Sequence, residues 1–84
     1  MYEVYLERRA ERDLKRLSEP DFGRVMQEIR ELAGNPRPIG SRKITGSLSD
    51  WRIRVGTFRV IYEIDDGSRA VRVMRVRPRR EAYR

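Results

Sequence analysis

One β-hairpin can be placed on this sequence residue by residue. Its segment reads WRIRVGTFRVIYE from position 51, and the Gly56-Thr57 pair within it suits a two-residue type II′ turn. Counting outward from the turn gives one face of apolar and aromatic pairs: Val55 with Phe58, Ile53 with Val60, and Trp51 with Tyr62. The other face sets Arg54 opposite Arg59 and Arg52 opposite Ile61. Because like charges directly opposite each other destabilise a sheet, folding alone gives no reason for this face, whereas a bound polyanion would.

A second hairpin follows, with two possible registers. A two-residue turn at Asp66-Gly67 pairs Tyr62 with Val71. A three-residue loop with a bulge instead pairs Ile64 with Ala70, Val60 with Met74 and Arg59 with Arg75. We favour the second register, which puts Met74 and Val76 on the apolar face and lines up Arg75, Arg77 and Arg79 beside Arg54 and Arg59. It leaves Arg72 on the core side, where its aliphatic stem must reach solvent.

The N-terminal part of the chain predicts a strand and two helices. Residues 2–6 read as a strand, and residues 8–17 as a helix with one apolar stripe. Pro20 fits the first position of a second helix, which Gly34-Asn35-Pro36 ends. Asp13 and Arg16 are spaced to form an ion pair on the surface of the first helix.

Residues 35–50 form a loop in this interpretation, with a short turn near Ile39. Its basic residues Arg37, Arg42 and Lys43 could contact a partner, although solvated loop charges are the simpler interpretation. The sequence therefore predicts one α+β domain over residues 1–84, with the order β-α-α-β-β-β. A helical hairpin packs on one face of a small, mainly antiparallel sheet, and the opposite face stays open and basic.

Charge is distributed unevenly along the chain. Residues 1–33 have a net charge of −1, and residues 34–84 have a net charge of +8. Eighteen of the twenty basic residues are Arg, whose planar fork matches pairs of phosphate oxygens. A GC-rich genome or a thermophilic source would explain the preference for Arg over Lys, but not the clustering. The C-terminal half is therefore expected to bind an anionic partner.

The residue types that the chain lacks limit the catalytic and metal-binding chemistry that it can perform. The chain has no Cys and no His, which excludes disulfides and thiolate metal sites and removes the commonest general base. We expect no metal and no cofactor. No apolar run approaches the roughly 18 residues of a membrane span, so we expect a cytoplasmic protein that does not associate with membranes.

The C-terminal half resembles a known family. The run WRIRVGTFRVIYEI over residues 51–64 is similar to the central segment of the RelE/ParE toxin superfamily of type II toxin–antitoxin systems. The tail VRPRREAYR over residues 76–84 resembles the C-terminal segment of that family, and the N-terminal strand, helical hairpin and Asn-Pro stop agree in order. Within this superfamily we favour the RelE-like branch, because the chain has a set of basic residues that includes Arg52, Arg54, Arg59 and Arg79.

This resemblance implies a toxin that cleaves mRNA on the ribosome and is neutralised by a cognate antitoxin. Arg52 and Arg54 match positions that orient RNA, Arg59 matches an arginine that stabilises the transition-state phosphate, and Arg79 matches a distal phosphate-binding arginine. Tyr83 matches a tyrosine near the attacking nucleophile. Arg75 and Arg77 extend the predicted RNA-binding face. The implied partners are mRNA, the ribosome and an antitoxin with an acidic, amphipathic segment, which forms a hetero-oligomer with the toxin.

The expected reaction is attack of an RNA 2′-hydroxyl on its own phosphate, which needs proton removal and charge neutralisation but no metal. Tyr83 is the candidate base, with Glu81 and Glu63 as substitutes that more plausibly pair with arginines. Tyr62 is assigned to the core. Two alternatives stay open: a ParE-like inhibitor of DNA gyrase, and a basic module that binds RNA without cutting it.

Overall fold

Two helices and five strands follow one another in the computed structural model, which describes residues 1–79. In chain order they are β1 (Glu3–Leu6), α1 (Arg8–Lys15), α2 (Glu19–Glu31), β2 (Arg42–Lys43), β3 (Asp50–Val55), β4 (Phe58–Asp65) and β5 (Ala70–Pro78). The strands form one sheet in the order β1-β5-β4-β3-β2. β1 runs parallel to β5, and every other neighbouring pair is antiparallel.

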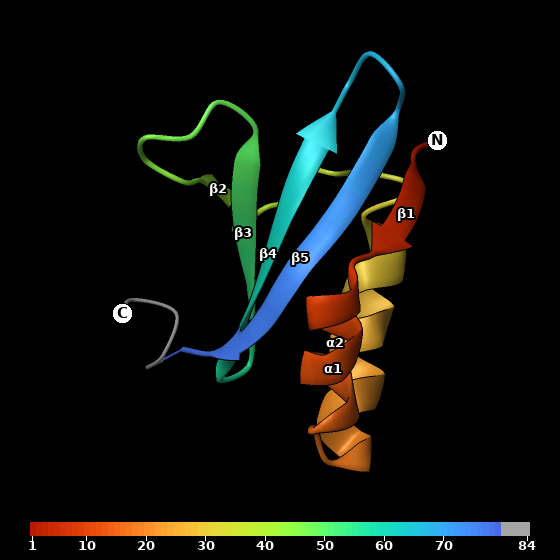
Figure 1. The fold of residues 1–84 in the computed structure, drawn as a ribbon, viewed down its shortest axis with the longest axis vertical. Coiled ribbons are helices and arrows are strands. Elements are labelled where there is room, and N and C mark those ends of the chain that lie inside the picture. Colours follow the sequence, from red (N-terminus) through yellow and green to blue (C-terminus); the bar gives the residue numbers. More distant parts are fainter. Residues whose placement is uncertain (80–84) are drawn as a thin grey trace.

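The helices lie together on one side of the sheet (Figure 1). Helix α1 packs on β5, and α2 packs on β3 and β4. The core between them contains the fully buried side chains of Tyr62, Ile29, Leu32, Val25, Val60, Val71 and Val73. This arrangement confirms the predicted α+β fold with a helical hairpin on one sheet face. Neither helix within residues 1–79 is long and apolar enough to cross a membrane.

The predicted element boundaries need small corrections. Ser18 caps α2 and its side chain accepts a hydrogen bond from the backbone N–H of Asp21 (3.3 Å), so Pro20 is the second residue of the helix rather than the first. Helix α1 ends at Lys15, two residues before its predicted end. The loop over residues 35–50 contains the short strand β2, which the sequence did not predict.

The first hairpin has the predicted register. Val55 lies opposite Phe58, Arg54 opposite Arg59 and Arg52 opposite Ile61, as the count from the turn requires. Gly56 has a φ of 59°, while Thr57 is outside the positive-φ region, as a type II′ turn requires. A glycine at this position therefore fixes the register of both strands.

Both registers considered for the second hairpin are wrong. Asp65 pairs with Ala70, which leaves a four-residue loop over residues 66–69. The Asp65 carboxylate accepts a hydrogen bond from the Ser68 N–H (3.2 Å), and Arg69 takes the positive φ of 53°. The Arg69 carbonyl then accepts a bond from the Glu3 N–H of β1 (2.9 Å). Side-chain capping and a contact with β1 therefore select a loop that turn rules based on Gly67 do not predict.

A bulge in β5 changes which of its residues face the core. The register shifts at Met74, so Tyr62 pairs with Val73 but Ile61 pairs with Arg75. The extra residue keeps Val76 in the core, as predicted, but Met74 is not part of the core cluster. Arg59 consequently pairs with Arg77 rather than with Arg75.

The prediction for Arg72 is also wrong. Arg72 is exposed and forms an ion pair with Glu63 on the neighbouring strand, with 2.9 Å between Nη1 and Oε1. It therefore belongs to the open face of the sheet.

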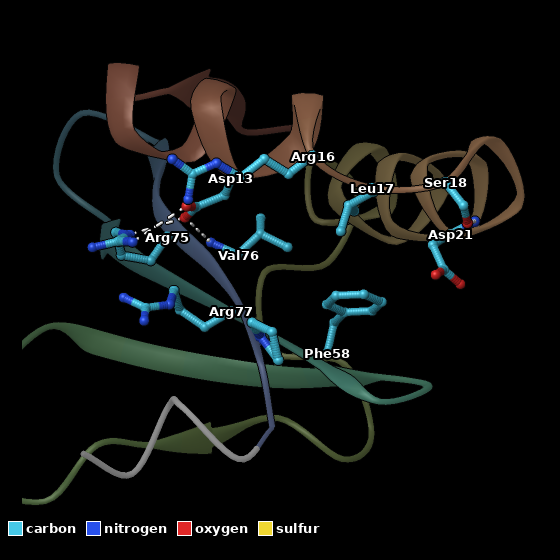
Figure 2. A pocket seen from close by; sticks show the side chains of 10 residues that line it. Asp13, Arg16, Leu17, Ser18, Asp21, Phe58, Arg75, Val76 and Arg77 are labelled. Atoms are coloured by element: carbon cyan, nitrogen blue, oxygen red, sulfur yellow. Dashed lines mark hydrogen bonds and ion pairs between the residues drawn. The ribbon is translucent and has the colours of Figure 1, made fainter.

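Asp13 holds the edge of β5 where β1 no longer covers it (Figure 2). Its Oδ2 accepts hydrogen bonds from the Val76 N–H and from Arg75 Nε, each at 2.9 Å. The Asp13 residue is 8% exposed, so this is a buried ion pair and not the predicted surface pair with Arg16. Burial alone would raise the pKa of Asp13, but the bonds from Arg75 and Val76 outweigh it and lower this pKa below its ordinary value.

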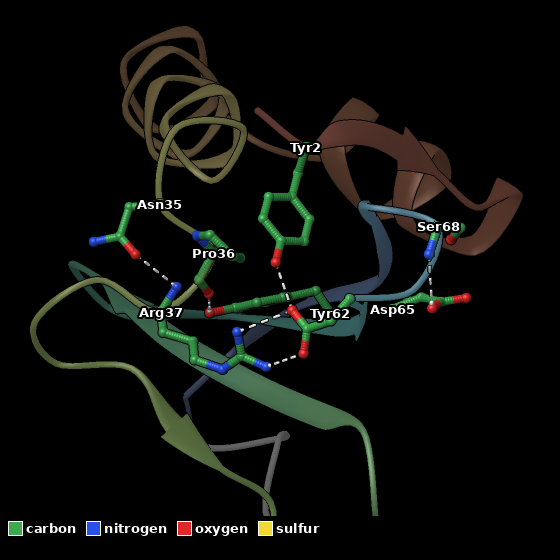
Figure 3. Close-up of polar contacts among 8 residues, drawn as sticks. Tyr2, Asn35, Pro36, Arg37, Tyr62, Asp65 and Ser68 are labelled. Carbon is green, nitrogen blue, oxygen red and sulfur yellow. Dashed lines mark hydrogen bonds and ion pairs between the residues drawn. The ribbon is translucent and has the colours of Figure 1, made fainter.

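A second polar network joins the loop after α2 to the β4–β5 turn (Figure 3). Arg37 binds both carboxylate oxygens of Asp66, at 2.8 and 3.2 Å, and its guanidinium lies 5.1 Å from the ring centroid of Trp51. The Tyr2 hydroxyl donates to the same Asp66 carboxylate. In the core below, the Tyr62 hydroxyl donates to the Pro36 carbonyl at 2.8 Å. Arg37 therefore has a structural role.

Asp13→Asn should destabilise the protein by about 2 kcal/mol at pH 7, because it removes the charged oxygen that binds both the Arg75 guanidinium and the Val76 N–H. A group with a lowered folded pKa stabilises the protein above its unfolded pKa and loses that effect as pH falls through the folded pKa. The parent and Asp13→Asn should therefore differ less in their free energy of unfolding by urea at acid pH than at pH 7. The control Glu11→Gln removes an exposed carboxylate of α1 and should leave stability within about 0.5 kcal/mol of the parent. Equal effects of the two changes would contradict the assignment.

Tyr62→Phe should cost about 1 kcal/mol at neutral pH, because it leaves the Pro36 carbonyl unsatisfied. Burial raises the pKa of Tyr62 to about 12. Between the unfolded pKa near 10 and this value, the unfolded chain releases its phenolic proton and the folded one does not, so the parent loses stability as pH rises. Denaturation curves of the two proteins should converge over that pH range. A constant difference would show that the hydroxyl is not held in the core.

Candidate functional site

The side chains on the open face of the sheet form three rows that run across the strands. Strand register places them as follows: Asp50, Glu63, Arg72 and Tyr5 in the first row, Arg42, Arg52, Ile61 and Arg75 in the second, and Arg54, Arg59 and Arg77 in the third. The third row is next to the Gly56-Thr57 turn. Positive charge is therefore concentrated in the two rows nearer the β3–β4 turn.

Five arginines, Arg42, Arg52, Arg54, Arg59 and Arg79, influence one another there, and we call them the cationic cluster. Burial, followed by the charges of Arg52, Arg54 and Arg79, lowers the pKa of Arg59. Burial, followed by the charges of Arg54, Arg42 and Arg79, likewise lowers the pKa of Arg52. Arginine nevertheless stays protonated in proteins, so these groups remain fixed positive charges.

Arg59 is the central member of the cluster. It is 5% exposed, which is rare for a charged side chain, and it lies on β4, the central strand of the sheet and the second strand of the hairpin whose register the turn fixes. Arg79 follows the end of β5, and its N–H donates to the Thr57 carbonyl at 2.7 Å. This bond ties the segment after β5 to the β3–β4 turn and brings Arg79 to the cluster.

The first row differs in character from the other two. Glu63 pairs with Arg72, and the Ser49 hydroxyl donates to the same carboxylate at 3.4 Å. Glu63 thus partners an arginine, as expected, and the Ile61 row separates it from Arg59. Its carboxylate is therefore poorly placed as a base for chemistry at Arg59.

The structure brings most of the predicted site residues together. Arg52, Arg54, Arg59 and Arg79 belong to the cationic cluster, and Arg77 lies directly opposite Arg59. Arg75 instead reaches from its row toward Asp13 at the sheet edge. Tyr83 and Glu81 lie outside the described residues.

Arg42 is a member of the cluster that sequence reasoning missed. It lies on β2 directly opposite Arg52, and its charge contributes to the lowered pKa of Arg52. A strand of two residues has no readable alternation, so the only available signal was its basic character. The sequence favours a solvated loop charge at Arg42 and leaves contact with a partner as the alternative.

A hollow of about 330 Å³ lies at the opposite edge of the sheet, between the end of α1 and the end of β5 (Figure 2). Phe58, Leu17 and Pro78 line one part of it, and the Asp13–Arg75 pair lines another. Its buried carboxylate is already bonded within the protein, so we do not assign it to chemistry. Among residues 1–79, no group of three or more acidic side chains is placed to hold a metal ion.

The cationic cluster is suited to phosphate groups. Guanidinium groups bind phosphate oxygens in pairs, and fixed charges in a partly buried site stabilise negative charge that develops in a transition state. Among the described residues, the face has no aromatic side chain in its second and third rows, which adjoin the cationic cluster, and Tyr5 lies in the first row opposite Arg72. It therefore offers phosphate binding with little capacity for aromatic base stacking.

Inorganic pyrophosphate should raise the melting temperature of the parent above that in sodium chloride of equal ionic strength, because a ligand of the folded state stabilises it. Arg52→Gln should reduce this rise. Arg72→Gln changes an arginine on the same face that is already paired with Glu63, and it should keep the full rise. An equal rise in all three proteins would indicate a general salt effect.

Comparison with known proteins gives a family match. The model of the ParE toxin of type II toxin–antitoxin systems (parDE) matches residues 4–83. A comparison with curated protein sequences finds no significant match.

Several solved structures share the fold. The toxin–antitoxin complex RelBE2 from Mycobacterium tuberculosis matches with 28% identity and a TM-score of 0.82, over 93% of this chain and 98% of that one. The archaeal RelE–RelB complex from Pyrococcus horikoshii matches with 24% identity and a TM-score of 0.80, over 93% and 94%. The intact E. coli RelBE complex matches with 20% identity and a TM-score of 0.81, over 93% and 96%.

Proposed function

The chain belongs to the ParE toxin family of type II toxin–antitoxin systems, and we propose that this toxin acts by cleaving mRNA on the ribosome. The observation that carries the proposal is the cationic cluster, in which Arg59 is nearly buried while Arg52, Arg54 and Arg79 act on it electrostatically. A toxin that works only by binding a protein has no need to converge arginines on one buried position. A phosphate that gains charge in a transition state does.

The arginines have distinct roles in this proposal. Arg59 contacts the scissile phosphate and neutralises its developing charge. Arg79, held beside the β3–β4 turn, binds the same phosphate or the next one. Arg52 and Arg54 hold the RNA strand in line across the neighbouring strand of the sheet, and Arg77 extends the positive field.

The reaction begins with the 2′-hydroxyl of the RNA. Its oxygen attacks the adjacent phosphorus, its proton passes to a base, and the bond from phosphorus to the 5′-oxygen breaks as that oxygen gains a proton. The products are a 2′,3′-cyclic phosphate and a 5′-hydroxyl. Tyr83 is the candidate base, because guanidinium groups close to a tyrosine would favour its phenolate. The ribosome supplies the strand geometry that this face lacks the aromatic residues to impose.

An antitoxin is the expected resting partner. RelB antitoxins accompany the toxin chains in the M. tuberculosis, P. horikoshii and E. coli complexes. The net charge of +7 makes an acidic segment the favourable partner for this toxin, and apolar residues of the same segment would cover exposed apolar side chains. The two proteins then form a hetero-oligomer in the cell.

Inhibition of DNA gyrase is the second candidate. The matching family model is that of ParE, and this observation favours a ParE-like activity. The two candidates differ in what they require of the cationic cluster. Gyrase inhibition would leave mRNA intact and would be detected as loss of DNA supercoiling by purified gyrase.

Cleavage should be tested with purified toxin, programmed ribosomes and a defined mRNA. The parent should leave 2′,3′-cyclic phosphate or 3′-phosphate ends and should not cut a strand with a 2′-O-methyl group at the scissile nucleotide. Arg59→Ala should slow cleavage by about 10²–10³-fold, the effect of removing one transition-state donor.

Arg72→Ala is the matched control for this experiment. It also removes an arginine from the open face, but from the row that Glu63 neutralises, so the cleavage rate should not change. Ends that carry a 3′-hydroxyl would contradict the proposed mechanism. Unchanged cleavage by Arg59→Ala would contradict the role of the cluster.

A further inference from the structure

A second hollow, of about 320 Å³, opens on the same face as the cationic cluster, where β2, β3 and β4 meet. Four cationic side chains line it, Arg42, Lys43, Arg52 and Arg59, together with Ile44 and Ile61. None of its lining residues is acidic. The hollow is therefore continuous with the cluster but differs from it in having apolar walls.

The position of Ile61 is unusual. Its row contains Arg42, Arg52 and Arg75, and no helix packs on this face of the sheet. An apolar side chain here does not join the core cluster of the domain, yet Ile61 is only partly exposed. Ile44, which follows β2, is also partly exposed and lines the same hollow.

The turn that carries Ile44 is held by backbone bonds. The Ile44 N–H donates to the Asp50 carbonyl at 2.8 Å, and the Ile44 carbonyl accepts from the Ser47 N–H at 3.2 Å. The first bond extends the pairing of β2 with β3 by one residue, and the second closes the turn that follows. The wall that Ile44 contributes is therefore fixed relative to Arg52.

A simple anion would need only the cations, and an apolar ligand would need only the isoleucines. A nucleotide needs both, because its phosphate is anionic while its base has two flat apolar faces. Aliphatic walls and guanidinium planes can both pack against a base. The combination of cations and apolar walls around the hollow thus favours a base that is attached to a phosphate over a free apolar molecule.

We propose that this hollow binds one nucleobase of an RNA strand whose phosphates lie on Arg52 and Arg59. The inference rests on the proposed function and adds to it a contact that orients the strand through a base. Ile61 and Ile44 form the apolar walls, and Arg42 or Arg52 packs its guanidinium plane on the exposed side of the base. Ile61 and Ile44 are therefore positioning residues for the nucleotide next to the scissile bond.

The test uses the full toxin chain and a short single-stranded RNA that carries 2′-O-methyl groups throughout, so that it is bound but not cut. One abasic nucleotide is placed in turn at each position, and dissociation constants are measured by fluorescence anisotropy at low salt. One abasic position should weaken binding to the parent by about fivefold to tenfold, the lower part of the range for packing of a single base.

Ile61→Thr links that loss to the hollow. Threonine keeps the β-branched shape that suits a strand, so the variant should fold, and its melting temperature is measured alongside. Ile61→Thr should bind the intact RNA more weakly than the parent does. It should also bind the intact RNA and the RNA that is abasic at the sensitive position with equal affinity. Leu48→Thr is the matched control, because Leu48 is 93% exposed and does not line the hollow.

Each outcome decides between explanations. If every abasic position has the same small effect in the parent and in Ile61→Thr, no base enters the hollow and the inference is wrong. If Ile61→Thr weakens only an acidic antitoxin peptide, the hollow holds a protein side chain and the inference is again wrong. Failure of the parent to bind RNA at low salt would instead overturn the phosphate-binding cluster, and with it the proposed function.

Discussion

The carboxylate of Asp13 lies where the edge of β5 loses its neighbouring strand. β1 pairs with β5 only as far as Val73, and beyond that point the edge would present unpaired backbone groups to the helix layer. Asp13 accepts the Val76 N–H in place of a strand carbonyl and binds Arg75 with the same carboxylate. One side chain of α1 therefore completes both the hydrogen bonding and the charge balance of this edge.

The contact with Asp13 also helps to determine which residues of β5 face the core and which face the open side of the sheet. The bulge at Met74 sits between the part of β5 that β1 covers and the part that Asp13 holds. Without the extra residue, strand alternation would turn Arg75 toward the core and Val76 toward solvent. With it, Val76 is buried and Arg77 lies opposite Arg59. The composition of the open face therefore depends on a buried contact on the other side of the sheet.

Three acidic side chains that form ion pairs lie away from the cationic cluster, so positive charge remains concentrated near the β3–β4 turn. Asp66 binds Arg37, Glu63 binds Arg72 and Asp13 binds Arg75, all of them away from the β3–β4 turn. Near that turn, burial and the charges of neighbouring arginines lower the pKa of Arg52 and of Arg59. Their mutual repulsion opposes folding, and the apolar face of the same strands supplies the compensating stability. A bound phosphate would relieve the repulsion.

Local rules were sufficient for some elements of the fold and insufficient for others. The first hairpin could be registered from sequence because one glycine and strict alternation leave a single solution. The second could not, because its loop depends on the Asp65 carboxylate and its bulge lies beside a contact from Asp13, which is distant in the sequence. The same reason explains the site. Arg54 and Arg59 follow from alternation, Arg75 was misplaced by the bulge, and Arg42 lies on a strand too short to have a pattern.

The sheet order has a consequence for how the toxin is made. β5 is the last strand among residues 1–79, yet it lies inside the sheet between β4 and β1, the first strand. During synthesis β1 has no partner, and Asp13 has neither of its ligands, until β5 has left the ribosomal exit tunnel. Contacts between such distant segments also slow folding, because a long loop must close before they form. A nascent chain that ends before β5 also lacks Arg77 and Arg79, so the cationic cluster is complete only after β5 and the residue that follows it have been synthesised.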